Sequence, residues 1–242
     1  MKKKPLDRIL SKRGLASRTE AQALLRTGKV RVGGQVIRDP LRAFDLERTD
    51  IQIEGTESVP AEASLTLALN KPRGTVVTRS DEKGRPTVFS LLPGQPRLVA
   101  VGRLDLATTG LLLLTNDTEF SGWVTDPKNA VARVYVATVR GKFTEEAARR
   151  MERGIEDDGE HLQARQVQVL KASQRETHLE VTLTEGKNRE IRRMFKGLGH
   201  EVTRLKRISF GGIALGSLEP GKWRKLSHQE LQTAFPGAPL MG

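Results

Sequence analysis

GRLDLATTGLLLLTND, residues 102–117, places a single carboxylate, Asp105, in a turn rich in glycine and threonine. Four consecutive leucines follow at 111–114, and a short apolar run of this kind predicts a buried strand. Reactive side chains often lie on loops that a rigid strand positions. Asp105 is therefore the first candidate for a catalytic residue, although an Asp two positions after an Arg is more often a structural ion pair or a turn cap.

From Leu65 onward the chain is richer in strand patterns than in helix patterns. Helical spacing predicts helices over 144–153 and 188–198, the second capped by Asn188, and a capping box at Ser227 predicts a short helix ending near Ala234. The predicted strands are 65–69, 75–78, 98–101, 111–115, 134–139, 167–170, 179–183 and 202–208. Because strands outnumber helices and interleave with them irregularly, we expect an α+β fold with a mainly antiparallel mixed sheet flanked by helices.

The first 58 residues predict a separate small domain of two helices and a hairpin. Apolar residues at helical spacing begin at Leu6, a capping box at Ser17 opens the second helix, and Gly28 ends it. Short alternating runs on either side of Gly33 and Gly34 then predict the hairpin. Residues 59–64 have no periodicity and are predicted to be a linker, which leaves 65–242 as a second domain.

Composition narrows the function classes. The 242 residues carry a net charge of +12 and contain no cysteine, which excludes disulfides and thiolate chemistry. The excess charge gathers in two regions, +4 over 1–65 and +8 over 186–225, while 66–185 is nearly neutral. Nucleic acid is the first candidate for a partner, with a generally basic surface as the alternative. No apolar run is as long as a membrane span and no signal core is present, so we expect a cytoplasmic protein.

Three further segments contain residue types suited to chemistry. Asn-Lys-Pro-Arg-Gly at 70–74 is a turn after a strand, where a plain β-turn is one interpretation and contact of Lys71 with a phosphate the other. Tyr135, the single tyrosine, lies in an alternating strand, where packing is the usual function and stacking on an unpaired base the alternative. The run 185–195 combines an apolar helix face with dense positive charge, which favours an anionic partner over a merely solvated face.

These segments, in this order, resemble the RsuA-type (RsuA/RluB-like) pseudouridine synthases over nearly the whole chain. The resemblance implies that Asp105 is catalytic, that Tyr135 packs against the target base, and that Arg192 pairs with Asp105. It also assigns Arg103, Lys71 and Ile191 to the support and lining of the base pocket. The first domain resembles the small RNA-binding domain named after ribosomal protein S-four. The implied RNA contacts are Arg13, Arg18, Arg26, Lys29, Arg31, Lys187, Arg189 and Arg193.

The resemblance implies isomerisation of a uridine in ribosomal RNA, with large-subunit RNA favoured by the run 184–190. The expected partner is ribosomal RNA or an assembling subunit, bound by a monomer without cofactor or metal. Burial disfavours an ionised carboxylate, and a guanidinium opposes that effect, which gives a physical reason for pairing Asp105 with Arg192. Two rivals stay open, a non-catalytic RNA-binding assembly protein and a nucleoside glycosidase. We expect RNA binding to weaken steeply with salt.

Overall fold

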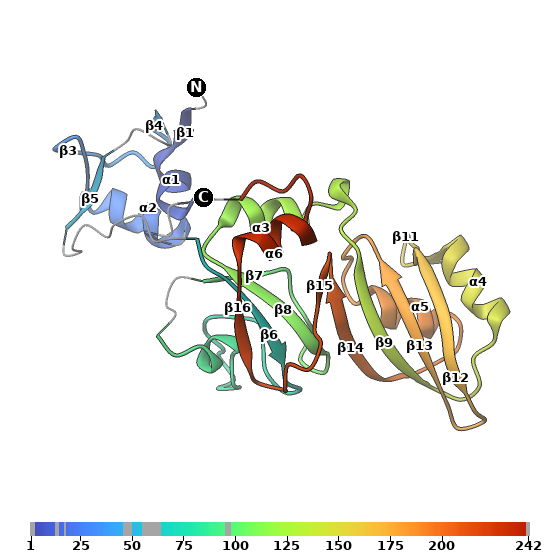
Figure 1. Ribbon diagram of the computed structural model, residues 1–242. Coiled ribbons are helices and arrows are strands. Elements are labelled where there is room, and N and C mark those ends of the chain that lie inside the picture. Colours follow the sequence, from blue (N-terminus) through green and yellow to red (C-terminus); the bar gives the residue numbers. More distant parts are fainter. Residues whose placement is uncertain are drawn as a thin grey trace. The chain divides into compact units, whose positions relative to one another are not determined.

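The chain of the computed structural model in Figure 1 divides into two compact units. The first comprises residues 1–64 with 116–118, and the second comprises 65–115 and 119–242. The structure describes residues 3–12, 15–16, 18–45, 50–54, 64–94 and 98–240. Within these residues, the fold is α+β in both units. The larger unit carries the segment of Asp105 and the long sheet, and it positions the candidate site.

The first unit has two helices over short antiparallel strand pairs, as the sequence predicts. Its core consists of Leu6, Ile9, Leu10, Ala21 and Leu25, together with Val30 and Ile37. Strand β2 pairs with β3 and β5, and β1 pairs with β4. The elements are β1 (Lys3–Pro5), α1 (Leu6–Lys12), α2 (Arg18–Arg26), β2 (Val30–Val32), β3 (Gln35–Val36), β4 (Ala43–Asp45) and β5 (Ile51–Ile53). The predicted capping residue Ser17 lies outside the described residues.

The second unit is built on a nine-stranded sheet with the order β12-β13-β9-β14-β8-β6-β16, to which β7 and β15 add at β8 and β14 (Figure 1). Every strand pair is antiparallel except β8 with β14. A separate hairpin pairs β10 (Ile155–Asp157) with β11 (Glu160–Leu162). The sheet strands are β6 (Thr66–Lys71), β7 (Val99–Val101), β8 (Thr109–Thr115), β9 (Arg133–Arg140), β12 (Gln166–Ala172), β13 (Glu176–Leu183), β14 (Val202–Phe210), β15 (Ile213–Ala214) and β16 (Trp223–Leu226).

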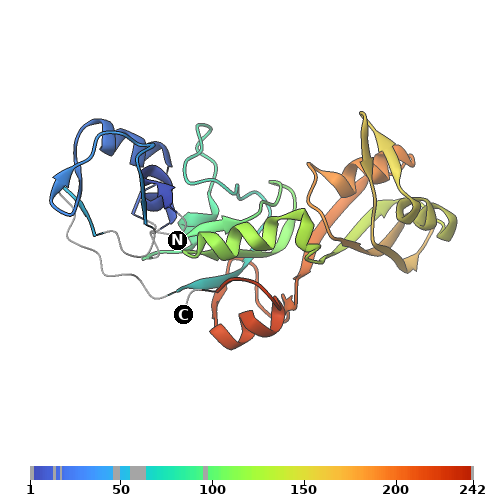
Figure 2. The ribbon, with the colours of Figure 1, turned by 90° about the horizontal axis from the view of Figure 1, so that it is seen from above.

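Helices cover different parts of the two sheet faces (Figures 1 and 2). The four leucines of β8 alternate, so Leu112 and Leu114 join the core that contains α4 (Glu145–Arg153) and α5 (Glu190–Gly197). Leu111 and Leu113 join the opposite core, against α3 (Thr118–Thr125) and α6 (His228–Ala234). The leucine run of β8 is therefore buried on both faces of the sheet.

Three local predictions can be compared with the structure. Thr144 caps α4 by accepting from the Ala147 amide, and the Ser227 capping box of α6 is confirmed. The predicted strand 75–78 is wrong, because these residues form only a single parallel bridge, from Val76 to Thr87, as the chain leaves the 70–74 turn. The sequence patterns did not predict α3.

Candidate active site

The loop between β7 and β8 carries Asp105. The Thr108 amide donates to the Asp105 carbonyl at 3.0 Å, which closes a tight turn. Gly110, the second residue of β8, has φ +99°, and an added Cβ would collide with the backbone of Arg207 on β14. Only glycine combines this backbone conformation with so close an approach. The glycine and threonine residues of the loop therefore bring Asp105 to the end of the buried β8–β14 strand pair.

The 70–74 turn holds this loop in place through hydrogen bonds. The Lys71 ammonium donates to the Thr108 carbonyl at 2.9 Å and to the Pro72 carbonyl at 3.1 Å. The Gly74 amide donates to the Leu106 carbonyl at 2.9 Å. Burial lowers the pKa of Lys71 to about 8, against the opposing effect of the Asp105 charge. Because Lys71 is fully buried, a contact between this side chain and an RNA phosphate is not available in this arrangement, so that alternative is wrong.

Helix α5 brings two guanidinium groups to Asp105. Arg189 Nη1 lies 3.5 Å and Arg192 Nε 3.9 Å from the same oxygen, Oδ2. Arg192 is the more buried of the two and also donates to the Val202 carbonyl at 3.0 Å. Burial lowers the pKa of Arg192, as does the neighbouring Arg189 charge, while Asp105 raises it. The pairing of Asp105 with an arginine of this helix is therefore present in the structure.

The start of α5 differs from the prediction. Its N-cap is Arg189, which adopts φ +49° and makes no side-chain capping hydrogen bond, so the predicted cap at Asn188 is wrong. The helix begins at Glu190, whose Oε2 accepts from the Lys187 amide at 3.2 Å. This carboxylate oxygen satisfies a backbone donor next to the helix start. The left-handed backbone at Arg189 belongs to the same turn from which its side chain reaches Asp105.

Asp105 opens onto a cavity of about 170 Å³. Tyr135 of β9 and Ile191 of α5, both buried, line it together with Leu183 and Leu205. Charged residues line the remainder: Arg103, Asp105, Arg133, Lys187, Arg189, Glu190, Arg192 and Arg207. The structure thus brings Asp105, Tyr135 and Arg192 to one cavity, with Arg103 and Ile191 at its wall. An apolar wall beside a carboxylate and several cations suits a flat ring that carries a phosphate.

Two of the arginines that line the cavity are buried and pack on the ring of Phe210. The guanidinium carbons of Arg133 and Arg207 lie 4.9 Å and 4.7 Å from its centroid. Arg207 donates from Nε to the Leu111 carbonyl at 2.7 Å. Within the described part of the chain, neither Arg207 Nη2 nor Arg192 Nε has a hydrogen-bond partner, although both atoms are buried. The sequence reasoning missed Arg207, because a cation in a strand pattern is ordinarily read as exposed.

Glu190 is a second residue that the sequence reasoning missed. It is 3% exposed, and burial raises its pKa to about 8, helped by a hydrogen bond and like charge from Glu185. Glu185 instead accepts from the Lys187 ammonium at 2.6 Å. Of the two carboxyl groups, Glu185 therefore carries the negative charge and Glu190 holds the proton. Helical spacing offered a signal, since Glu190 precedes the buried Met194 by one turn on the apolar face.

The other cations predicted to contact RNA differ in their ion pairs and in their exposure. Arg193 binds Asp157 and Glu160 of the β10–β11 hairpin, each at 2.5 Å. In the first unit, Arg18 pairs with the buried Asp7 at 3.3 Å. Arg26, Lys29 and Arg31 are not buried, and Arg13 lies outside the described residues.

The described residues contain no cluster of three or more His, Asp or Glu side chains that could hold a metal ion. They also contain no helix that is long and apolar enough to cross a membrane.

The fold and the cavity together suit a protein that binds a flat ring with an attached phosphate. Residues 66–196 match the RNA pseudouridylate synthase family, and residues 4–41 match the S4 domain. The chain belongs to the RNA pseudouridylate synthase family, in the RsuA/RluB group whose members carry an N-terminal domain of the S-four type. It is therefore a pseudouridine synthase, an isomerase.

Relatives of similar length support this assignment. The chain is 36% identical to "Ribosomal large subunit pseudouridine synthase B" of Bacillus subtilis over 94% of this chain and 93% of that protein. It is also 36% identical to an "Uncharacterized RNA pseudouridine synthase" of Aquifex aeolicus over 97% and 95% of the two chains. A solved "pseudouridylate synthase" structure, 28% identical, covers 94% of this chain and 98% of its own with a TM-score of 0.69.

Proposed function

We propose that this protein isomerises a specific uridine of ribosomal RNA, with large-subunit RNA as the favoured substrate. The observation that carries the proposal is the placement of Asp105, held by Arg189 and Arg192 at the mouth of a cavity walled by Tyr135 and Ile191. The similarity to the Bacillus subtilis protein supports the choice of substrate. Since that substrate is made and processed in the cytoplasm of a bacterium, we infer that the protein acts there. We also infer that it acts as a monomer.

The reaction needs no added atom and no redox step. The bond from N1 of uracil to the anomeric carbon breaks, the base turns, and a bond from C5 to that carbon forms. C5 loses its proton and N1 gains one, so the product is an isomer of the substrate. Adding to the base, bonding the anomeric carbon and removing a sugar proton are three roles open to the Asp105 carboxylate. Each requires the ionised form, and Arg192 and Arg189 stabilise that charge.

The remaining side chains position the nucleotide. Tyr135 and Ile191 offer apolar surface to the uracil ring, and Lys71 and Arg103 support the loop and the mouth of the cavity. The target base must leave its stack, which costs a few kcal/mol and less in loops and bulges. Cations that bind phosphates offset this cost: Lys187, Arg189 and Arg193 in the second unit, and Arg13, Arg18, Arg26, Lys29 and Arg31 in the first.

A non-catalytic RNA-binding function in ribosome assembly is the competing proposal. It accounts for the charge of the chain and for the first unit. It gives no reason for a carboxylate and two guanidiniums to meet at a cavity that is walled by Tyr135 and Ile191.

The deciding experiment is tritium release from ribosomal RNA labelled at C5 of uracil, with wild type compared with Asp105→Asn. We expect release by wild type and a loss of about 100-fold or more in the variant, which keeps the shape of the side chain but removes its charge. Free uracil as the product would indicate a glycosidase. If neither naked RNA nor partly assembled subunits yield tritium, the binding function is the better account. Equal release by both proteins would keep the reaction and discard Asp105 as its catalytic residue.

A further inference from the structure

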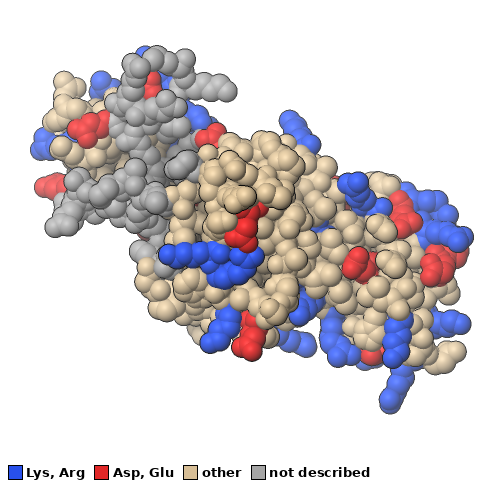
Figure 3. All heavy atoms as spheres, viewed as in Figure 1, with Lys and Arg blue, Asp and Glu red and all other residues tan. Residues whose placement is uncertain are grey.

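A second basic hollow, of about 800 Å³, lies away from the cavity of Asp105. The β12–β13 hairpin, the end of β9 and the start of β14 form it. Its lining residues are Arg140, Lys171, Ser173, Arg175, Glu176, His178, Thr203 and Arg204. Four cations face one carboxylate there, so the hollow is positively charged. Figure 3 shows Lys and Arg gathered over this end of the second unit.

The hollow opens on the sheet face opposite to Tyr135. In the register of β9 and β13, Ala137 pairs with Leu179 and both are buried in the core that includes Tyr135. The next pair, Thr138 with His178, points the other way because side chains alternate along strands. The two basic sites therefore lie on opposite faces of one sheet, and a single nucleotide cannot occupy both.

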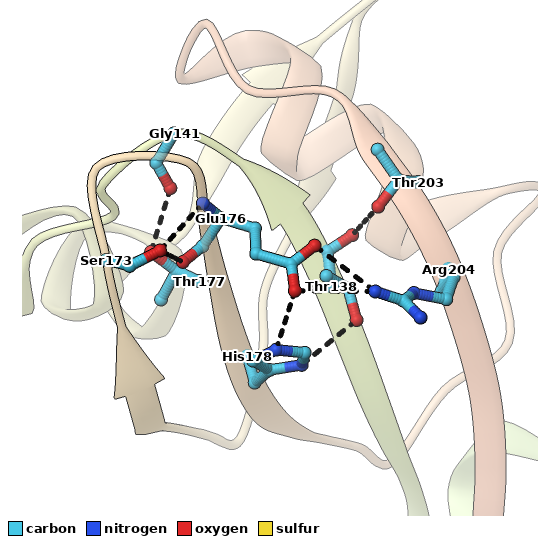
Figure 4. Close-up of polar contacts among 8 residues, drawn as sticks. All are labelled: Thr138, Gly141, Ser173, Glu176, Thr177, His178, Thr203 and Arg204. Atoms are coloured by element: carbon cyan, nitrogen blue, oxygen red, sulfur yellow. Dashed lines mark hydrogen bonds and ion pairs between the residues drawn. The ribbon is translucent and has the colours of Figure 1, made fainter.

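The floor of the hollow is held in place by hydrogen bonds (Figure 4). His178 Nε2 lies 3.1 Å from Glu176 Oε1, and its Nδ1 lies 3.2 Å from the Thr138 hydroxyl. A carboxylate only accepts, so Nε2 donates to Glu176. In the neutral ring Nδ1 then accepts from the Thr138 hydroxyl. Glu176 also pairs with Arg204 at 3.2 Å. One carboxylate thus fixes both a ring and a guanidinium, and a ligand would find these groups already oriented.

The rim of the hollow carries cations that the protein itself does not neutralise. Arg140 pairs with Glu201 at 3.4 Å, and Arg204 pairs with Glu176. Lys171 and Arg175, on either side of the hairpin tip, are exposed and have no ion pair within the part of the chain that the structure describes. Like charges placed close together repel each other, and an anionic ligand relieves that repulsion. Two free cations beside a fixed floor suit successive phosphates of a nucleic-acid backbone.

We propose that this hollow binds the phosphate backbone of an RNA segment distinct from the one that presents the target uridine. The proposal rests on the RNA substrate of the family and extends the proposed function by a second contact with the same molecule. Because the hollow offers cations and few base-reading groups, this contact adds affinity and orientation and carries little sequence information. The chemistry remains at Asp105, so loss of the hollow affects RNA binding and not turnover by bound enzyme.

The test compares the full-length double variant Lys171→Ala/Arg175→Ala with Arg149→Ala/Arg150→Ala, which removes two exposed cations from α4. Binding to an unmodified large-subunit ribosomal RNA transcript is measured over a series of KCl concentrations. The slope of log affinity against log salt changes by about 0.7 to 0.9 for each phosphate contact. We therefore expect the hairpin variant to lose about 1.5 from this slope and to bind several-fold more weakly at low salt. The control pair should retain the wild-type slope.

Equal slopes for the two double variants would overturn the proposal. The proposal would also be overturned if polyglutamate bound at the hollow while the hairpin variant kept the wild-type salt slope for RNA. That result would assign the hollow to an acidic protein. Single-turnover tritium release at saturating RNA should be unchanged in the hairpin variant, and a loss there would also contradict the proposal. Binding is measured without turnover. A protein that binds RNA through the hollow but releases no tritium would therefore refute the proposed function and leave this inference standing.

Discussion

Replacing Glu190 by glutamine tests how the protein tolerates a buried carboxyl beside its candidate active site. Glu190 is 3% exposed and burial raises its pKa to about 8, from an ordinary value of 4.5. The folded protein therefore holds a proton that the unfolded chain releases between these two values. The contribution of Glu190 to the free energy of unfolding is then fully present below about pH 4.5 and falls as the pH rises toward 8. Glutamine has nearly the shape of the protonated acid and does not titrate.

The expected magnitude follows from proton linkage. Each pH unit between the two pKa values changes the free energy of unfolding by at most about 1.4 kcal/mol. From pH 6 to pH 8 the contribution of Glu190 should fall by about 2 kcal/mol, because the titration is half complete near 8. A glutamine side chain at this position can still accept from the Lys187 amide and stays uncharged, so Glu190→Gln should remove this loss. The variant should be the more stable protein at pH 8.

The measurement is urea unfolding at a series of pH values from 6 to 8, fitted for the free energy of unfolding in water. Glu219→Gln serves as the matched control, because Glu219 is exposed and the same charge is removed there. We expect this control to follow the wild-type pH dependence. If Glu190→Gln and wild type lose stability in parallel over this range, the proton does not reside on Glu190 and the reasoning fails.

Two other substitutions test the loop and the ion pair. Arg192→Ala should lower single-turnover tritium release by about 100-fold, because Asp105 loses its more buried cation and its position; wild-type release by a folded variant would contradict this. Gly110→Ala should lower the free energy of unfolding by about 3 kcal/mol or more, since the added methyl meets the Arg207 backbone at φ +99°. A thermal melt compared with Gly186→Ala, whose added Cβ has nothing within 4 Å, measures that loss, and equal melting temperatures would refute it.

The sequence predicted the parts of the site that short segments define. Asp105 follows from its glycine-rich turn before the leucines. The support of its loop by Lys71 was implied by resemblance, and the structure shows Lys71 donating to the Thr108 carbonyl of that loop. The Ser227 capping box is a contact between residues three apart, and its pattern is visible in the sequence alone. The pairing of Asp105 with Arg192 was implied by resemblance, and the structure places the two side chains 3.9 Å apart.

The features that the sequence did not predict depend on contacts between distant segments. Arg207 is buried because β14 pairs in parallel with β8, nearly 100 residues earlier, and its Nε reaches the Leu111 carbonyl. No periodicity in the 202–208 run signals that pairing. The second hollow likewise needs four strands brought side by side, so Lys171, Arg175 and Arg204 looked like ordinary surface charge. Local pattern reveals a turn or a cap, while an assembled surface needs the strand order.

The cavity of Asp105 is built at a cost in stability that a substrate can offset. Arg207 Nη2 and Arg192 Nε are buried donors without hydrogen-bond partners in the described structure, and such a group costs about 1–3 kcal/mol. Their neighbour Glu190 adds no negative charge when it holds its proton, so the cations lining the cavity outnumber its carboxylates. We expect oxygens of a bound nucleotide to accept from these donors and its phosphate to offset the excess positive charge. Substrate binding should then stabilise the protein against unfolding.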